Sequence, residues 1–247
     1  MTLDLYTAGN ALHGVNLAVQ SPSNLAAFYV THLGMEARQV GANIHLTYPG
    51  SATALILSPA HKSQPYEPSV NDRYWKIGIT LPDLDHACRD LCTRGVAVSP
   101  PIQFENIGYM AHLNDPEGFK IELLQHTFQG QDKKTIAQTN IPLGGGCRLA
   151  HITLRTTNID RETAHFVHEL GMKLLSIQPL PAYGFDLYFF AYTNELPPQS
   201  DLLSVQNRPW LWQRPYTCIE LQHLHHSDTQ LLFTDAGSAG FVELVIS

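Results

Sequence analysis

Hydrophobic and polar residues alternate in short runs along this chain, and turn signals separate the runs. In 13–19 every second residue falls on the same face of an extended chain, which predicts a strand. Asn24 is suited to cap the start of a helix that runs to residue 32, and Gly34 to end it. Further strands are expected at 37–40, 44–48 and 53–57. The first unit is therefore β-α-β-β-β.

The same order of elements recurs twice more, and a fourth copy breaks off. The second unit is predicted as a strand, a helix and three strands, at 75–81, 83–91, 96–98, 108–113 and 119–125. The third has a strand, a helix beginning near Asp160 and three strands, at 151–156, 160–170, 173–178, 185–192 and 216–223. The last residues have room for strands at 230–234 and 241–246 but for no helix. The pattern predicts an α+β fold of tandem βαβββ modules with a truncated fourth module.

Two stretches of the sequence echo each other, which supports an internal repeat. In 12–37 and 149–175 a His opens a strand-like run, a Phe follows fifteen residues later, and Leu-Gly-Met comes at 33–35 and 170–172. A polar and then glycine-rich stretch at 129–147 lies between the second and third units and reads as a linker. The predicted domains are residues 1–128, with two modules, and residues 148–247, with one complete module and the fragment.

Composition narrows the class of protein. The 247 residues are 44% hydrophobic and 15% charged, which is typical of a globular protein, and a net charge of −7 argues against a nucleic-acid partner. No apolar run is long enough to span a membrane, and no basic-then-apolar leader opens the chain, so a cytoplasmic location is expected. The four cysteines are interpreted as small buried hydrophobes rather than a disulfide framework.

Strand alternation also predicts which polar side chains face a cleft. Ile and Leu residues next to His151, Glu220 and Glu122 fall on the opposite face of their strands, the face that should pack against helices. An imidazole with carboxylates suits Zn²⁺, Ni²⁺, Fe²⁺ or Mn²⁺, and such a metal polarises a carbonyl while a carboxylate moves a proton. The competing interpretation is a His bonded at the rim of a sheet and two solvated strand carboxylates.

The pairing of the modules decides which of these groups can meet. If modules one and two close on each other, the set is His13, Lys76 and Glu122, which is poor for a metal. If modules two and three pair, the set is Glu122, His151 and Glu220 beside Lys76, a three-ligand site. The sequence leaves both arrangements open.

Several segments carry a resemblance to a known family. They are the His13 strand with Leu-Gly-Met at 33–35, the Gly-Ile-Thr-Leu-Pro-Asp run at 78–83, the Asn-Asp-Pro-Glu-Gly-Phe-Lys-Ile-Glu-Leu run at 114–123 and the His151 strand. In these segments the chain resembles the vicinal-oxygen-chelate superfamily, which includes glyoxalase I, extradiol dioxygenases and bleomycin resistance proteins. The third module is most similar to glyoxalase I. The resemblance implies pairs of modules curled into half-open barrels around a metal.

The resemblance also suggests roles for single residues. Glu122 matches a position that is both metal ligand and proton-transfer base, and Glu220 and His151 match further ligand positions. Arg155 matches one that holds a glutathione carboxylate. Lys76 stands where metalloenzymes of the superfamily usually have a His, so it could hold a substrate carboxylate or replace the metal's charge. His13 is a further candidate ligand, although leucine or isoleucine occupies the carboxylate position of its module.

Three functions follow as hypotheses. The first is a metal-dependent, glyoxalase-I-like lyase or isomerase acting on a small carbonyl compound or its thiol adduct, glutathione among the thiols. The second is an extradiol-type dioxygenase, which needs two His and a carboxylate on Fe²⁺ and against which Lys76 counts. The third is a non-catalytic protein that binds a small ligand in the cleft. A homodimer could cover the surface left by the truncated module. The histidines at 223, 225 and 226 and the tryptophans at 210 and 212 are interpreted as surface and packing features.

Overall fold

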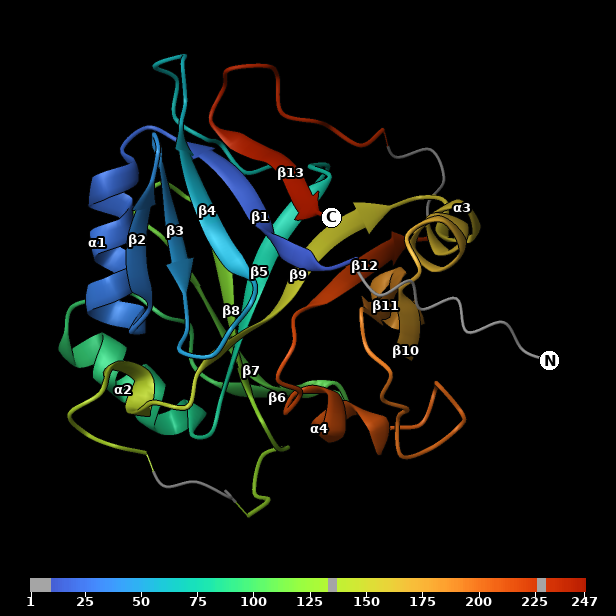
Figure 1. Ribbon diagram of the computed structural model, residues 1–247. Helices are drawn as coiled ribbons and strands as arrows, with labels where there is room; N and C mark the ends of the chain where they lie inside the picture. Colours follow the sequence, from blue (N-terminus) through green and yellow to red (C-terminus); the bar gives the residue numbers. More distant parts are fainter. Residues whose placement is uncertain (1–9, 133–136, 226–229) are drawn as a thin grey trace.

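The computed structural model describes residues 10–132, 137–225 and 230–247, and these form two β-sheets with helices packed against them (Figure 1). The first module comprises a strand, a helix and three strands, namely β1 (Leu12–Val19), α1 (Pro22–Leu33), β2 (Glu36–Val40), β3 (Asn43–Thr47) and β4 (Ala54–Pro59). Helix α1 begins before Asn24 because Pro22 suits a first turn, where no backbone N–H is needed. It ends as predicted at Gly34, whose φ is 72°.

The second module repeats this order, with one displaced strand. Its elements are β5 (Tyr74–Leu81), α2 (Leu84–Thr93), β6 (Ile102–Phe104), β7 (Gly108–Asn114) and β8 (Lys120–Gln125). The Asp83 carboxylate caps α2 by accepting from the His86 N–H at 3.0 Å. The strand predicted at 96–98 is wrong. Val96 instead donates its N–H to the carbonyl of Leu91 at the end of α2, and the strand forms later, as β6.

The third module is complete, and the fourth is a single strand. The elements of the third module are β9 (Arg148–Thr156), α3 (Ile159–Thr163), a π-helical turn (Ala164–Glu169), β10 (Lys173–Leu180), β11 (Phe185–Ala191), α4 (Asn207–Leu211) and β12 (Cys218–Leu224). Strand β13 (Gly240–Ile246) follows. The other strand expected at the C-terminal end, at 230–234, is wrong, since Leu232 makes only an isolated bridge with Asp72. The α+β fold of βαβββ modules is confirmed.

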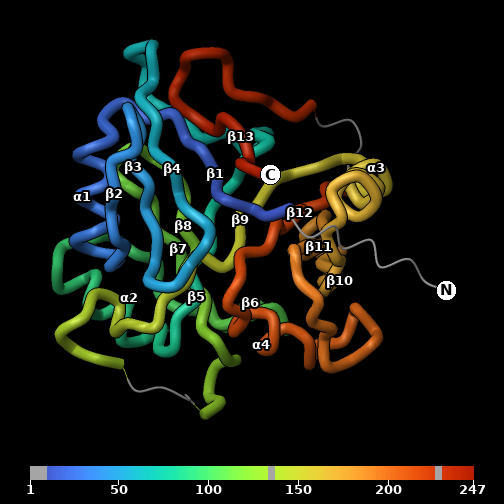
Figure 2. Tube along the Cα trace, viewed as in Figure 1, coloured from blue at the N-terminus to red at the C-terminus, as the bar shows by residue number. Residues whose placement is uncertain are grey.

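The order of strands in the sheets shows how the modules pair. One sheet has the order β13-β1-β4-β3-β2, and the other has the order β10-β11-β12-β9-β5-β8-β7-β6. Module one thus closes on the fragment through the antiparallel pair β1 and β13, and modules two and three join through the antiparallel pair β5 and β9 (Figure 2). The eight-stranded sheet contains strands from both sides of the predicted linker, 129–147. The division into domains 1–128 and 148–247 stays a prediction.

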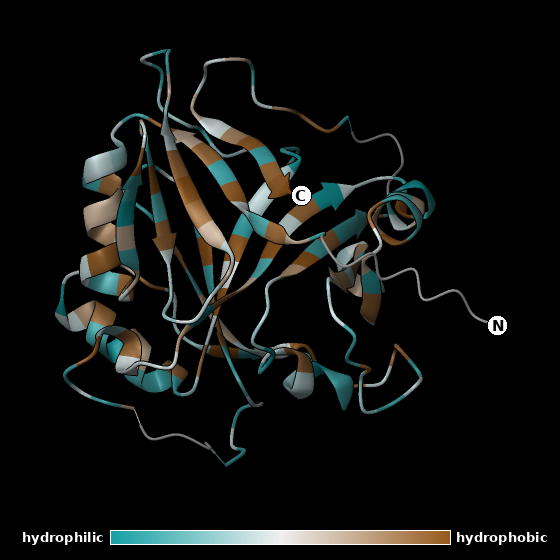
Figure 3. Ribbon diagram, in the orientation of Figure 1, coloured by the Kyte–Doolittle hydropathy of each residue, from teal (hydrophilic) through white to brown (hydrophobic). Residues whose placement is uncertain are grey.

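A shared hydrophobic core lies against both sheets, and a second cluster lies on the other face of the larger one. Strand residues that alternate between hydrophobic and polar produce this separation (Figure 3). Leu123 belongs to the main core, whereas its neighbour Leu124 joins the second cluster with Phe189 and Trp212. The second cluster therefore forms the concave face of the eight-stranded sheet. No helix within the described residues is long and apolar enough to cross a membrane.

Candidate active site

Four polar side chains gather on the concave face of the eight-stranded sheet. They come from four neighbouring strands and are Glu220 of β12, His151 of β9, Lys76 of β5 and Glu122 of β8. Their hydrophobic neighbours Ile152, Ile219 and Ile121 are buried in the main core on the opposite face. The alternation of side chains along each strand thus sends this polar set toward the cleft.

Gly78 makes room for the imidazole in this cluster. In the strand register Gly78 lies opposite both Glu122 and His151, so the imidazole passes directly over β5. A Cβ atom on Gly78 would lie 1.9 Å from both Cε1 and Nε2 of His151. Because no side chain other than hydrogen fits there, the sequence at the centre of β5 is dictated by the site and not by strand propensity.

The distances within the cluster join all four groups. The Nε2 atom of His151 lies 3.2 Å from Oε1 of Glu122 and 3.3 Å from Oε2 of Glu220. The Lys76 ammonium lies 2.5 Å from Oε2 of Glu122 and 3.7 Å from Oε1 of Glu220. None of the four side chains is more than 5% exposed. These charges therefore interact with little screening by solvent.

The lysine and the carboxylate nearest to it keep each other charged. Burial has the largest influence on the pKa of Glu122 and raises it, but the Lys76 ammonium and the hydrogen bond from His112 outweigh burial and hold that pKa well below its usual range. Burial likewise lowers the pKa of Lys76, and the attraction of Glu122 and Glu220 more than reverses this effect. Lys76 is thus a cation at neutral pH, and Glu122 is an anion.

A cavity of about 320 Å³ opens onto these groups. Among the described residues that line it, Lys76, Glu122, Glu220 and His112 carry charged or ionisable side chains. The others are hydrophobic, with large contributions from the aromatic residues at 75, 104, 185, 189 and 212. His151 lies behind the carboxylates, with its ring edge against Phe189. The arrangement offers an apolar pocket with a charged floor, which suits a small hydrophobic molecule that carries an oxygen function.

The donor types in the cluster suit a divalent metal, but the set as a whole does not fit one. In favour of a missing partner, both ring nitrogens of His151 and Oε1 of Glu220 are buried without a hydrogen bond of acceptable geometry. Against it, the Lys76 ammonium contacts both carboxylates and already balances one of their two charges. A dication held by the same oxygens would lie beside a buried ammonium and be repelled by it. No chemical step is therefore assigned to a metal.

Of the other residues predicted from sequence, His13 lies away from the cluster. It is exposed on β1, in the five-stranded sheet, and its Nε2 atom is 2.8 Å from the hydroxyl of Ser247. Module one closes on β13 rather than on module two, so a set of His13, Lys76 and Glu122 does not form. The structure therefore does not place His13 in the same site as His151.

Arg155 is buried beside the site, and the protein itself occupies its guanidinium. The Nε atom donates to the Gln222 side-chain oxygen at 3.0 Å, and Nη1 donates to the carbonyls of Asp72 at 3.0 Å and Ser69 at 3.3 Å. Arg155 also lies over the ring of Trp75, 5.1 Å from its centroid, and Trp75 lines the cavity. Arg155 itself is not among the residues that line the cavity. The arrangement makes Arg155 a support for the cavity wall, and its predicted contact with substrate stays a prediction.

Sequence reasoning missed His112, which belongs to the site. Its Nε2 atom lies 3.1 Å from Oε2 of Glu122, and its side chain is 33% exposed at the edge of the cavity. The predicted strands at 108–113 and 119–125 contained the signal, because a tight turn between them places His112 directly opposite Glu122. The contributions of Phe189 and Trp212 had no comparable local signal.

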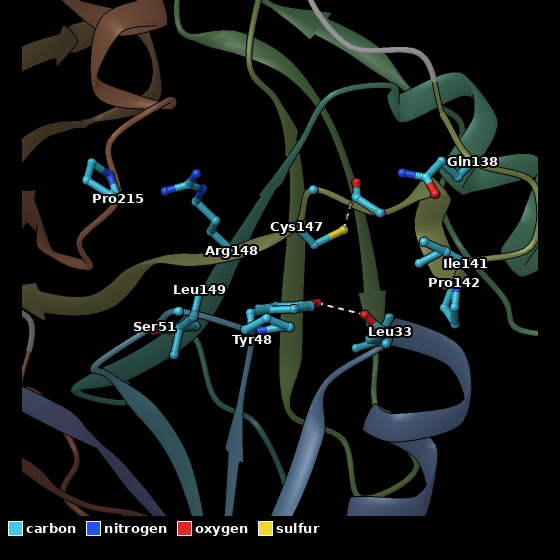
Figure 4. Close-up of a pocket in the computed structure, with 15 residues that line it drawn as sticks. Leu33, Tyr48, Ser51, Gln138, Ile141, Pro142, Cys147, Arg148, Leu149 and Pro215 are labelled. Atoms are coloured by element: carbon cyan, nitrogen blue, oxygen red, sulfur yellow. Dashed lines mark hydrogen bonds between the residues drawn. The ribbon is translucent and has the colours of Figure 1, made fainter.

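A hollow of about 400 Å³ between the linker and the first module has different chemistry. Figure 4 shows its labelled side chains, with the Tyr48 hydroxyl donating to the Leu33 carbonyl at 2.8 Å. Arg148 and Cys147 line it, but none of its lining residues is a carboxylate or a histidine. Burial raises the pKa of the Cys147 thiol to about 12, which makes it a poor nucleophile. This hollow therefore offers no acid–base pair among its described lining residues.

Another group of potential ligands lies outside the cavity, on β11 and β12. Asp186, His223 and His225 have donor atoms within 4.8 Å of one another, and they are the set among the described residues that meets this spacing. His223 lies directly opposite Asp186 across the two strands, and the Nε2 atom of His225 is 2.9 Å from the Asp186 carboxylate. His226, which was grouped with these histidines, lies outside the described residues.

Known proteins share the fold of this chain and are similar to part of its sequence. Residues 11–123 match the family model of the Glyoxalase/Bleomycin resistance protein/Dioxygenase superfamily. Glyoxalase I of Saccharomyces cerevisiae (strain ATCC 204508 / S288c) is 27% identical over 117 residues, which are 47% of this chain and 33% of the yeast protein. The match therefore spans about a third of that relative's length.

Solved structures share the fold over more of the chain. Glyoxalase I from Zea mays has a TM-score of 0.66 at 17% identity, covering 96% of this chain and 74% of the maize chain. A mutant of the same maize protein has a TM-score of 0.62 at 18% identity, over 87% and 69% of the two chains. Residues 11–123 thus match the Glyoxalase/Bleomycin resistance protein/Dioxygenase superfamily, the vicinal-oxygen-chelate superfamily that the sequence resembles, and most of the chain shares its fold with glyoxalase I from maize.

Proposed function

We propose that this protein is a glyoxalase-like enzyme that isomerises a small, largely apolar carbonyl compound, free or as its thiol adduct, by moving a proton between adjacent carbons. One observation carries the proposal. Glu220 is buried at the floor of an apolar cavity, its Oε1 atom has no hydrogen-bond partner, and a lysine ammonium lies 3.7 Å from that atom. A carboxylate base beside a fixed cation is the pair that enolisation needs.

The proposed reaction divides the work between these two groups. In the hydrate or thiol adduct of an α-keto aldehyde, the Glu220 carboxylate takes a proton from the hydroxyl-bearing carbon next to the carbonyl. The electron pair of that C–H bond forms a C=C bond, and the π pair of the carbonyl moves onto the carbonyl oxygen. Lys76 donates a hydrogen bond to this oxygen and stabilises the enediolate. The hydroxyl proton of the first carbon then passes to this oxygen, a new C=O bond forms at the first carbon, and the former carbonyl carbon takes the proton back from Glu220. The result is an isomerisation that needs no oxidant or reductant.

The remaining groups hold this pair in place. Glu122 anchors Lys76 at 2.5 Å, and His112 approaches the same oxygen of Glu122 at 3.1 Å. His151 lies between Glu122 and Glu220 and sets their separation. The hydrophobic walls exclude water, which strengthens the interaction of the ammonium with a developing oxyanion. The name of the yeast relative, glyoxalase I, supports this class of chemistry.

The test is a turnover assay with α-keto aldehydes. Methylglyoxal and phenylglyoxal are supplied with and without glutathione, and formation of thioester or hydroxy acid is measured. We expect activity with at least one of them, greater for the phenyl compound because the cavity is apolar. Glu220→Gln should lower kcat by about 100-fold or more, the usual contribution of a general base. His13→Asn is the matched control and should leave kcat unchanged.

A binding function is the second candidate, and the hydrophobic lining of the cavity favours it. If the protein only binds a ligand, phenyl-containing compounds should change the fluorescence of Trp75 and Trp212 without turnover. Glu220→Gln would then alter affinity alone. Binding without product from any of the aldehydes would contradict the enzymatic proposal.

A further inference from the structure

We propose that Lys76 is a built-in cation that takes the place of a metal ion in this site, so that the protein works without one. This inference deepens the proposed function, since it names the electrophile. It can be tested separately because its main measurement is metal content. It starts from the mismatch between the donor set and a metal.

The cluster contains two buried carboxylates and one buried ammonium. Glu122 and Glu220 have side chains that are 5% and 1% exposed, and two buried carboxylates require a compensating cation. Lys76 contacts both of them. Two carboxylates and one ammonium leave a single negative charge. The lysine therefore does the electrostatic work that would otherwise call for a bound ion.

The strand order places Lys76 between the two carboxylates. Strand β5 runs between β8, which carries Glu122, and β9, which separates β5 from the strand of Glu220. In the register, Lys76 and Glu220 both lie opposite Thr153 of β9, and Thr153 is buried. The long lysine side chain thus starts two strands away from Glu220 and ends in the space between the two carboxylates. A lysine amine has three donor hydrogens, so after Glu122 and Glu220 it can still donate to a substrate oxygen.

The two carboxylates are arranged around the Lys76 ammonium. Among the described residues, the donor atoms of Asp186, His223 and His225 lie within 4.8 Å of one another, and those of Glu122, His151 and Glu220 do not form such a set. Metal–ligand bonds to nitrogen and oxygen are about 2.0–2.2 Å, so an ion would draw the carboxylates inward and meet the ammonium. Instead, both carboxylates approach the Nε2 atom of His151, at 3.2 Å and 3.3 Å, and the Lys76 ammonium lies at the other oxygen of each.

A substitution at this one position should convert the site. Lys76→His removes the ammonium and adds a second imidazole, which produces a set of two His and two Glu of the kind that binds Zn²⁺, Co²⁺ or Ni²⁺. The surface group would confuse a metal count, so all variants carry His225→Ala as a common background. Co²⁺ is the probe because its visible absorption reports ligand number and geometry. Folding of each variant is checked by circular dichroism.

We expect the His225→Ala parent, dialysed against Co²⁺, to hold no stoichiometric metal and to keep its melting temperature in chelator. The variant with Lys76→His should hold one Co²⁺ per chain with the absorption of a four- or five-coordinate site, and Glu220→Gln in that variant should abolish it. If Lys76→His fails to fold, Lys76→Gln takes its place with the same expectation.

Two results would overturn the inference. One is a parent that holds one metal per chain, lost on Glu220→Gln, because Lys76 would then coexist with an ion. The other is a folded Lys76 variant that binds none, because the ammonium would then not be what keeps the metal out. The proposed function fails on a different measurement, the absence of turnover by the parent.

Discussion

Replacing Gly78 with alanine should displace the His151 ring and disrupt the candidate active site. The added Cβ would lie 1.9 Å from two ring atoms of His151 and 2.4 Å from a third, far inside contact distance. The His151 ring is fully buried between Glu122 and Glu220, so it cannot swing aside without breaking these contacts or displacing Phe189. The methyl group and the imidazole therefore cannot share the space.

The magnitude follows from overpacking a rigid interior. Such substitutions cost about 1–3 kcal/mol, and more where nothing can yield. In a protein of this size each kcal/mol lowers the melting temperature by about 2–4 °C, so Gly78→Ala should lower it by roughly 2–12 °C. Turnover should fall as well, since His151 no longer holds the carboxylates apart.

A double-mutant cycle identifies the cause. His151→Ala removes the clashing ring, so Gly78→Ala should cost little stability when added to His151→Ala. A coupling of about 1–3 kcal/mol is expected from denaturant unfolding of the four proteins. If Gly78→Ala costs the same in both backgrounds, or costs nothing in either, the claim that β5 carries a glycine for the sake of His151 is refuted.

Three further predictions concern the charges around the site. Lys76→Met should lower the free energy of unfolding, measured in urea, by about 3–5 kcal/mol because it leaves buried carboxylates unpaired. Adding Glu122→Leu should restore part of this loss. A cost below about 1 kcal/mol for Lys76→Met would contradict the ion pair. The folded pKa of Glu122 is depressed, so its stabilisation is present above its unfolded pKa of about 4.3 and is lost as the pH falls toward the folded value. The stability difference between the parent and Glu122→Gln should therefore shrink below about pH 4, and a difference that grows on acidification would show the wrong sign. Arg155→Lys should cost about 1–3 kcal/mol by losing its hydrogen bonds to the carbonyls of Asp72 and Ser69, with KM nearly unchanged; a large rise in KM at constant stability would restore its role in substrate binding.

Local sequence patterns foretold much of the architecture and the direction of the polar side chains. Alternation with a period of two is a property of each strand alone, so it places His151, Glu122 and Glu220 opposite their hydrophobic neighbours without knowledge of the rest of the fold. Gly34 marked the end of α1. The predicted strand at 96–98 failed because a short apolar run does not reveal whether a sheet edge is within reach.

The sequence by itself determined the βαβββ modules and the faces of their strands, because side-chain alternation and turn chemistry act over a few residues. Only the tertiary structure decided that β5 pairs with β9 and β1 with β13, since any free strand edge satisfies local rules and long-range packing selects the partner. That choice excluded His13 from the cluster and brought His151 and Glu220 beside Lys76 and Glu122. It also carried the Lys76 ammonium into the gap between two carboxylates from distant parts of the chain.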